Sequence, residues 1–279
     1  MPGSEGLLVK GSRNLKEWRE TALNNADGIK QSRMLPVWLP VTFILFHFVL
    51  IGVCVRYTRE LSPTGLAVAS ILLYFCALTA GTITLLWSCK HYQVSAKALG
   101  IRPSNMRADF RWSFRICALG AFLITVAIVI GFVAALCLGV RLPAPPASYV
   151  HVLGGNWSDV QFLAIAGLGG AIATVLAPVT EELIYRSLFL PPLTHRLGLY
   201  PAIVVTSLVF GLAHVVPFGQ IRIPLPEIVG GLLMAIGFAI RWSVVPAIVI
   251  HALGNLVAGT LALIYVRLFI AYPTLFVAP

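Results

Sequence analysis

Long uninterrupted runs of apolar residues are the feature that most constrains the fold of this chain. A helix needs about 20 consecutive apolar residues to cross a bilayer. A membrane β-barrel would instead show alternating segments of about ten residues, and none is visible in the sequence. The 279-residue chain is 58% hydrophobic and 11% charged, and a soluble domain usually carries about twice that charged fraction. The sequence therefore predicts an all-α, polytopic transmembrane helical bundle.

The runs divide the chain into a polar start and a membrane region. We expect residues 1–33 to form a polar cytoplasmic amino-terminal segment and residues 34–279 to form a single membrane domain. The predicted helices are Leu35–Val55, Gly65–Ser88, Ile116–Val140, Gln161–Leu193, Tyr200–Val216, Ile228–Ile240 and Val244–Leu268. The fourth run is too long for one straight span and contains Pro178, which predicts a kink or a break. The total is therefore seven to eight helices.

Basic residues gather beside these runs and predict the orientation of the chain. If the amino terminus is cytoplasmic, the inner segments hold the basic clusters at 10–33 and 90–115 together with Arg196 and Arg241. The outer segments then hold far fewer basic residues, as the positive-inside rule requires. Clusters of this kind meet anionic headgroups. We expect a multi-pass protein with the lipid bilayer as a partner and no nucleic-acid binding, despite a net charge of +10.

Three short polar patterns interrupt the apolar runs in the second half of the chain. They are Glu181-Glu182-Leu183-Ile184-Tyr185-Arg186, Phe210-Gly211-Leu212-Ala213-His214 and His251-Ala252-Leu253-Gly254-Asn255. Ionisable groups at membrane depth cost several kcal/mol unless they are paired or hydrated, so they are functional candidates by default. The motif-bearing core is therefore expected at about residues 161–268.

Helical spacing distinguishes the two adjacent glutamates. Glu182 and Arg186 are four residues apart, which places them on one helix face in the order that favours an ion pair. Glu181 is rotated from this face by ~100°, so it has no partner on its own helix and is expected to point into a cavity. His251 and Asn255 are also four residues apart, on one face of another helix.

Depth predicts that these groups meet. At 1.5 Å per residue from the expected cytoplasmic boundaries, Glu181, His214 and Asn255 lie about 20 Å deep, and His251 about 6 Å lower. Three helices thus present polar groups at similar heights. Phe210, one turn before His214, is interpreted as core packing.

The chemistry open to these groups is narrow. A carboxylate among apolar groups can act as a general base on water, and a histidine opposite can share the water proton or protonate a leaving amine. A second histidine with an asparagine amide can hold an oxyanion. This set suits amide hydrolysis without a covalent intermediate. Alternatively, Glu181, His214 and His251 could be three ligands of Zn²⁺ with a water in the open position. No HExxH motif is present, and both mechanisms stay open.

The ordered motifs EExxxR, FxxxH and HxxxN, each on its own predicted helix, resemble the CPBP family. This family includes type II CAAX prenyl endopeptidases, bacteriocin-processing and immunity proteins, and abortive-infection proteins. The resemblance covers about Ala166–Val257. It implies a site in which Glu181 is the catalytic base supported by Glu182 and Arg186, His214 acts on the water or a metal, and His251 with Asn255 stabilises the oxyanion.

The resemblance also implies an activity. The expected function is that of an intramembrane endopeptidase acting near the carboxy terminus of a membrane-associated protein or peptide, such as a prenylated CAAX tail. Family members are described both as metalloproteases and as glutamate-driven enzymes, so Zn²⁺ remains one of two alternatives. Two other classes compete with this interpretation. A proton-coupled transporter uses the same residue types for proton relays, and a non-catalytic membrane scaffold or immunity protein would keep the helices for binding.

Overall fold

The computed structural model describes residues 36, 38, 41, 42, 44, 45, 63–101, 105–145, 150, 153, 154, 167–214 and 224–277. This part of the chain is almost entirely helical, and its only strand-like pairing is a single bridge between Leu142 and Phe276. The all-α prediction is therefore confirmed for these residues. The predicted segment 1–33 lies outside them, as does most of Leu35–Val55, so the predicted total of seven to eight helices is not tested.

The described helices follow the predicted apolar runs closely. They are α4 (Pro63–His91), α5 (Met106–Cys137), a continuous helical stretch at 167–197, α10 (Leu199–Ala213), α11 (Leu225–Arg241) and α12 (Val244–Ala271). Met106–Cys137, Gly167–Leu197 and Val244–Ala271 are each long and apolar enough to cross a membrane, and α10 is a shorter apolar helix. The chain is an integral membrane protein.

The stretch at 167–197 switches from α-helical to π-helical hydrogen bonding at two places. The π-helical segment η2 (Ile172–Leu176) leads into α8 (Ala177–Glu182), and a second one, η3 (Leu183–Phe189), leads into α9 (Leu190–Leu197). Pro178 lacks the N–H that an α-helix interior needs, and η2 ends at Leu176, two residues before it. Proline therefore does not break the helix here. The predicted break is absent, and the helix instead changes locally to π-helical bonding, which is frequent at functional sites; the predicted kink stays a prediction.

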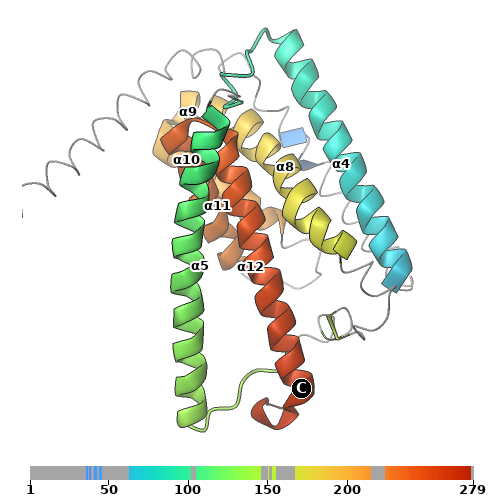
Figure 1. Cartoon of the computed structure of the whole chain (residues 1–279). Coiled ribbons are helices and arrows are strands. Elements are labelled where there is room, and N and C mark those ends of the chain that lie inside the picture. Colours follow the sequence, from blue (N-terminus) through green and yellow to red (C-terminus); the bar gives the residue numbers. More distant parts are fainter. Residues whose placement is uncertain are drawn as a thin grey trace, which may run out of the picture.

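α12 is the central element of the bundle. It packs against α5 on one side and against η2, α8 and α11 on others, while α4 contacts the 167–197 stretch (Figure 1). α10 and α11 pack closely because Gly231 of α11 lies against the backbone of α10, where an added Cβ would approach the Ser207 Cα to 3.1 Å. This packing brings the three motif-bearing helices together.

Candidate active site

Glu182 and Arg186 form the buried ion pair that their spacing predicts. The Arg186 Nε lies 3.2 Å from the Glu182 Oε2, and both side chains are 0% exposed. The Arg186 Nη2 also donates a hydrogen bond to the Gly231 carbonyl at 3.1 Å, which ties α11 to this helix. The predicted pairing is confirmed, and the carbonyl partner is new, because no sequence pattern marks a backbone acceptor on another helix.

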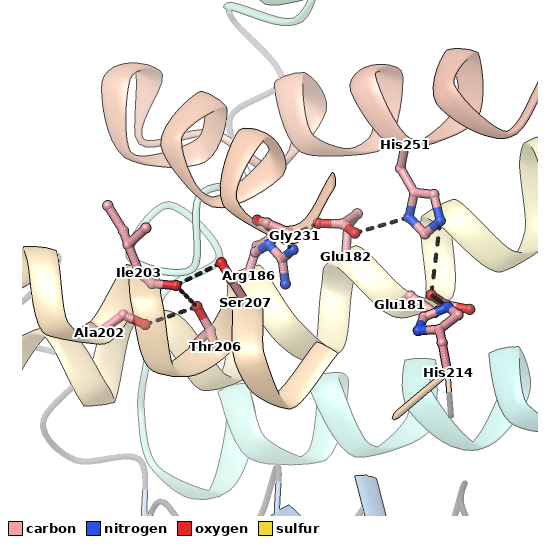
Figure 2. A network of polar contacts seen from close by, with 10 residues as sticks. All are labelled: Glu181, Glu182, Arg186, Ala202, Ile203, Thr206, Ser207, His214, Gly231 and His251. Atoms are coloured by element: carbon pink, nitrogen blue, oxygen red, sulfur yellow. Dashed lines mark hydrogen bonds and ion pairs between the residues drawn. The ribbon is translucent and has the colours of Figure 1, made fainter. Parts of the chain in front are cut away.

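Glu182 has a second role toward α12. Its Oε1 lies 3.0 Å from the Nδ1 of His251 (Figure 2). With Glu182 ionised beside Arg186, this oxygen can only accept, so Nδ1 carries the hydrogen. The imidazole is thereby oriented with its Nε2 turned away from Glu182. A carboxylate placed behind an imidazole in this way also stabilises a positive charge that develops on the ring.

His214 is held in the same manner from α10. Its Nδ1 lies 2.8 Å from the Phe210 carbonyl oxygen. A carbonyl can only accept, so Nδ1 again carries the hydrogen and Nε2 faces the other way. Two histidines on different helices are therefore fixed through their Nδ1 atoms, and each leaves its Nε2 free for chemistry.

Both free nitrogens face Glu181, as Figure 2 shows. The Glu181 Oε2 lies 3.8 Å from the Nε2 of His214 and 3.9 Å from the Nε2 of His251. The glutamate is only 6% exposed, and this oxygen has no hydrogen-bond partner in the described part of the chain. These separations are too long for direct hydrogen bonds but suit a bridging water. The prediction that Glu181 meets the histidines rather than a partner on its own helix is confirmed.

Phe210 packs at the centre of this cluster rather than in a remote part of the core. It is 3% exposed. Its ring makes edge contacts with Tyr185 and His251, lies 4.6 Å from the His214 ring, and has the Arg186 guanidinium carbon 5.1 Å from its centroid. The interpretation of Phe210 as core packing is confirmed, but the residues it packs against are those of the candidate site.

Asn255 lies one turn beyond His251, and its environment differs from the prediction. Its Nδ2 donates to the Ala173 carbonyl at 2.7 Å. Within η2 the Ala177 N–H donates to the carbonyl five residues back, that of Ile172. The next acceptor in this register is Ala173, whose donor would be residue 178, a proline without an N–H. Asn255 thus satisfies the carbonyl that proline leaves without a donor.

The sequence predicts Asn255 at the level of Glu181 and His251 about 6 Å lower, and the structure differs. His251, not Asn255, lies level with Glu181. The estimate counted 1.5 Å per residue from His195, but η3 lies between His195 and Glu181. A π-helical turn holds more residues than an α-helical one, so Glu181 is less deep than an ideal α-helix would place it.

Glu181, His214 and His251 were also the predicted ligands of Zn²⁺. Tetrahedral zinc sites hold their nitrogen and oxygen ligands at about 2.0–2.2 Å from the ion. Among the residues that the structure describes, no group of three or more His, Cys, Asp and Glu side chains has the arrangement needed to hold a metal ion. The Glu181 Oε2 lies 3.8 and 3.9 Å from the two Nε2 atoms, and the alternative in which these three residues hold Zn²⁺ stays a prediction.

The fold and the buried cluster define a helical membrane protein with a carboxylate and two oriented histidines enclosed between helices. Residues 163–257, 95 of the 279, match the model of the family described as type II CAAX prenyl endopeptidase Rce1-like. The match contains all three motifs and confirms the resemblance to the CPBP family. No curated protein and no solved structure shows a significant match to the chain.

Proposed function

We propose that the chain is an intramembrane endopeptidase that cleaves near the carboxy terminus of a membrane-associated protein or peptide. The observation that carries the proposal is the convergence of the Glu181 Oε2 with the Nε2 atoms of His214 and His251 at 3.8 and 3.9 Å. The family match supports a CAAX-type protease in general. Substrates with a lipidated tail fit this proposal, since such a tail reaches a membrane-embedded site by partitioning into the bilayer.

In the proposed mechanism a water molecule lies between Glu181 and His214. It donates one hydrogen bond to the Glu181 Oε2 and the other to the His214 Nε2. Glu181 takes the first proton as general base while the water oxygen attacks the scissile carbonyl carbon. The His251 imidazolium, held from behind by Glu182, donates its Nε2–H to the developing oxyanion. The C–N bond then breaks, and Glu181 gives its proton to the leaving amine, which restores the carboxylate.

Asn255 has a positioning role in this proposal. Its amide bonds to the Ala173 carbonyl, so it fastens α12 to the helix that carries Glu181. The second hydrogen on its Nδ2 stays available as a donor. Arg186 and Glu182 likewise act through His251, because Glu182 contacts the imidazole and Arg186 neutralises Glu182.

Cleavage by the purified full-length protein tests the proposal. Prenylated and unprenylated carboxy-terminal peptides would be incubated with wild type, His214→Gln and His251→Gln, and the products identified by mass spectrometry. His195→Gln is the matched control, because His195 is exposed and lies outside the cluster. We expect cleavage by wild type and His195→Gln, and a loss of about 100-fold or more in each cluster variant, the size of a general acid–base contribution.

Two results would count against the proposal. Cleavage by His214→Gln and His251→Gln at the rate of the His195→Gln control would show that the two histidines do not take part in the reaction. No cleavage of any peptide by a folded wild type, together with proton-coupled uptake in vesicles that His214→Gln abolishes, would favour a transporter instead.

A further inference from the structure

A second feature, away from the Glu181 cluster, is a groove between the starts of α5 and α12. It has a volume of about 520 Å³ and is lined by Met106, Arg107, Phe110, Arg111 and Val245. The two helix starts lie at the same end of the bundle (Figure 1), where the Val244 N–H donates to the Gly100 carbonyl. The groove therefore combines two guanidinium groups with three apolar side chains.

Both cations in the groove lack an acidic partner among the described residues. The Arg111 Nε donates to the Arg107 carbonyl, a contact that neutralises neither charge. The nearest acid in sequence, Asp109, is 1% exposed and accepts two 2.8 Å contacts from Arg241 through its Oδ1. Arg107 and Arg111 are both exposed. Two positive charges thus remain available to an anionic ligand.

The groove lies where a membrane would expose phosphate groups. Arg111 precedes the apolar segment that begins at Ile116 by five residues, or about 7–8 Å of helix, which places its guanidinium at headgroup level. Beyond this point the apolar face of α5 continues, with Phe114 50% and Phe122 63% exposed. None of the most apolar window of α5 is buried within the protein. An acyl chain can therefore run from the groove along this face.

We propose that this groove binds an anionic phospholipid, with its phosphate on Arg107 and Arg111 and its acyl chains against Phe110 and the outer face of α5. Basic pockets between transmembrane helices on the cytoplasmic side are a recurring form of lipid headgroup site. This site is independent of the proposed peptidase activity, because none of its residues belongs to the Glu181 cluster. A lipid with a net negative charge would gain the attraction of both arginines in full, and a zwitterionic lipid, whose choline offsets the charge of its phosphate, would gain less.

Native mass spectrometry of the purified full-length protein tests the proposal. The protein in detergent would be titrated with dioleoyl phosphatidylglycerol or with dioleoyl phosphatidylcholine, and the dissociation constant of the first bound lipid compared. A basic residue near an anionic surface contributes about 1 kcal/mol, which is about fivefold in affinity. We expect Arg107→Gln/Arg111→Gln to weaken phosphatidylglycerol binding by about 25-fold and to weaken phosphatidylcholine binding by no more than about fivefold, because the choline offsets the charge of its phosphate.

Arg115→Gln is the matched control, because Arg115 is an exposed arginine one turn further along α5 that does not line the groove. It should bind phosphatidylglycerol as wild type does, and Arg107→Lys/Arg111→Lys should retain most of the affinity. Equal loss in Arg115→Gln, or no loss in the double Gln variant, would overturn the proposal. Displacement of the lipid by millimolar inorganic phosphate would identify a free-phosphate site and overturn the lipid assignment.

Discussion

Glu181 and Glu182 are adjacent, both buried and chemically identical, yet the same substitution should affect stability very differently at the two positions. Glu182 is bonded to His251 and paired with Arg186. Glu181 faces two imidazoles at 3.8 and 3.9 Å without a hydrogen bond on its Oε2. Comparing Glu181→Gln with Glu182→Gln therefore separates the residue that acts on substrate from the residue that holds the site.

The expected magnitude follows from the burial of each pair. Glu182→Gln leaves the buried Arg186 charge without a carboxylate, and its remaining contacts among the described residues are the Gly231 carbonyl and the rings of Tyr185 and Phe210. Removing one partner of a buried ion pair costs about 3–5 kcal/mol. The glutamine oxygen can still accept from the His251 Nδ1, so we expect the lower end, about 3 kcal/mol. Glu182→Leu/Arg186→Leu removes both charges and should recover most of this loss.

Glu181→Gln changes a buried carboxylate whose Oε2 has no hydrogen-bond partner in the described part of the chain. We expect its free energy of unfolding to stay within about 1 kcal/mol of wild type, or to rise, because an unpaired buried acceptor is itself costly. Equilibrium unfolding in mixed micelles by titration with sodium dodecyl sulfate measures both variants under one condition. A difference of at least about 2 kcal/mol between them is predicted.

Two outcomes would refute this reasoning. Equal destabilisation by the two substitutions would mean that Glu181 is part of the same structural network as Glu182. A stable Glu182→Gln would mean that Arg186 does not depend on this carboxylate.

Four further substitutions test contacts within the bundle by the same unfolding measurement. Gly231→Ala should destabilise the protein by about 1–3 kcal/mol, because the added Cβ would press on the backbone of α10. Gly259→Ala is the control: a Cβ added there meets no atom within 4 Å, so the free energy of unfolding should stay the same or rise slightly. Asn255→Ala should cost about 0.5–1.5 kcal/mol, the net contribution of one hydrogen bond, because its contact with the Ala173 carbonyl is exposed, and equal stability would show that water replaces the amide. Asp109→Asn should cost about 1–2 kcal/mol by weakening the charge-assisted bonds to Arg241, which is one-third exposed. An unchanged free energy of unfolding would show that the Asp109–Arg241 pair does not contribute to stability.

Much of the fold was predictable because lipid imposes a simple rule on sequence. The spans have to be apolar for their full length, so the runs at Gly65–Ser88, Tyr200–Val216 and Val244–Leu268 correspond to helices within a few residues. Helix α5 is different, since it begins at Met106 rather than Ile116. Hydropathy marks where a helix enters lipid, and α5 starts earlier, in the basic segment outside the apolar span.

The predictable part of the site follows from the spacing within single helices. The Glu182–Arg186 pair and the isolation of Glu181 both follow from an i, i+4 rule, and both were predicted correctly. The contacts between helices, such as Arg186 with the Gly231 carbonyl, were not predictable because they depend on packing. The position of Asn255 was also missed. It follows from the π-helical segment before Pro178, and Pro178 was the only sequence signal for that segment.

Tyr185 shows a related limit. Tyr185 is 3% exposed and packs on Phe210, a burial that its place between Glu182 and Arg186 does not predict. The three residues between Glu182 and Arg186 face different sides of their helix. Which of them is buried depends on where α10 and α4 pack against that helix, and the sequence does not give these positions.

The central claim is that Glu181 activates the attacking water. Its most direct test is the single-turnover cleavage rate of Glu181→Gln against wild type on the peptide that wild type cleaves fastest, with both proteins shown to be equally stable. A general base contributes about 10²–10⁴-fold, so the account predicts that Glu181→Gln cleaves at least about 100-fold more slowly. A rate within about tenfold of wild type would contradict it, since that is below the range for a lost general base.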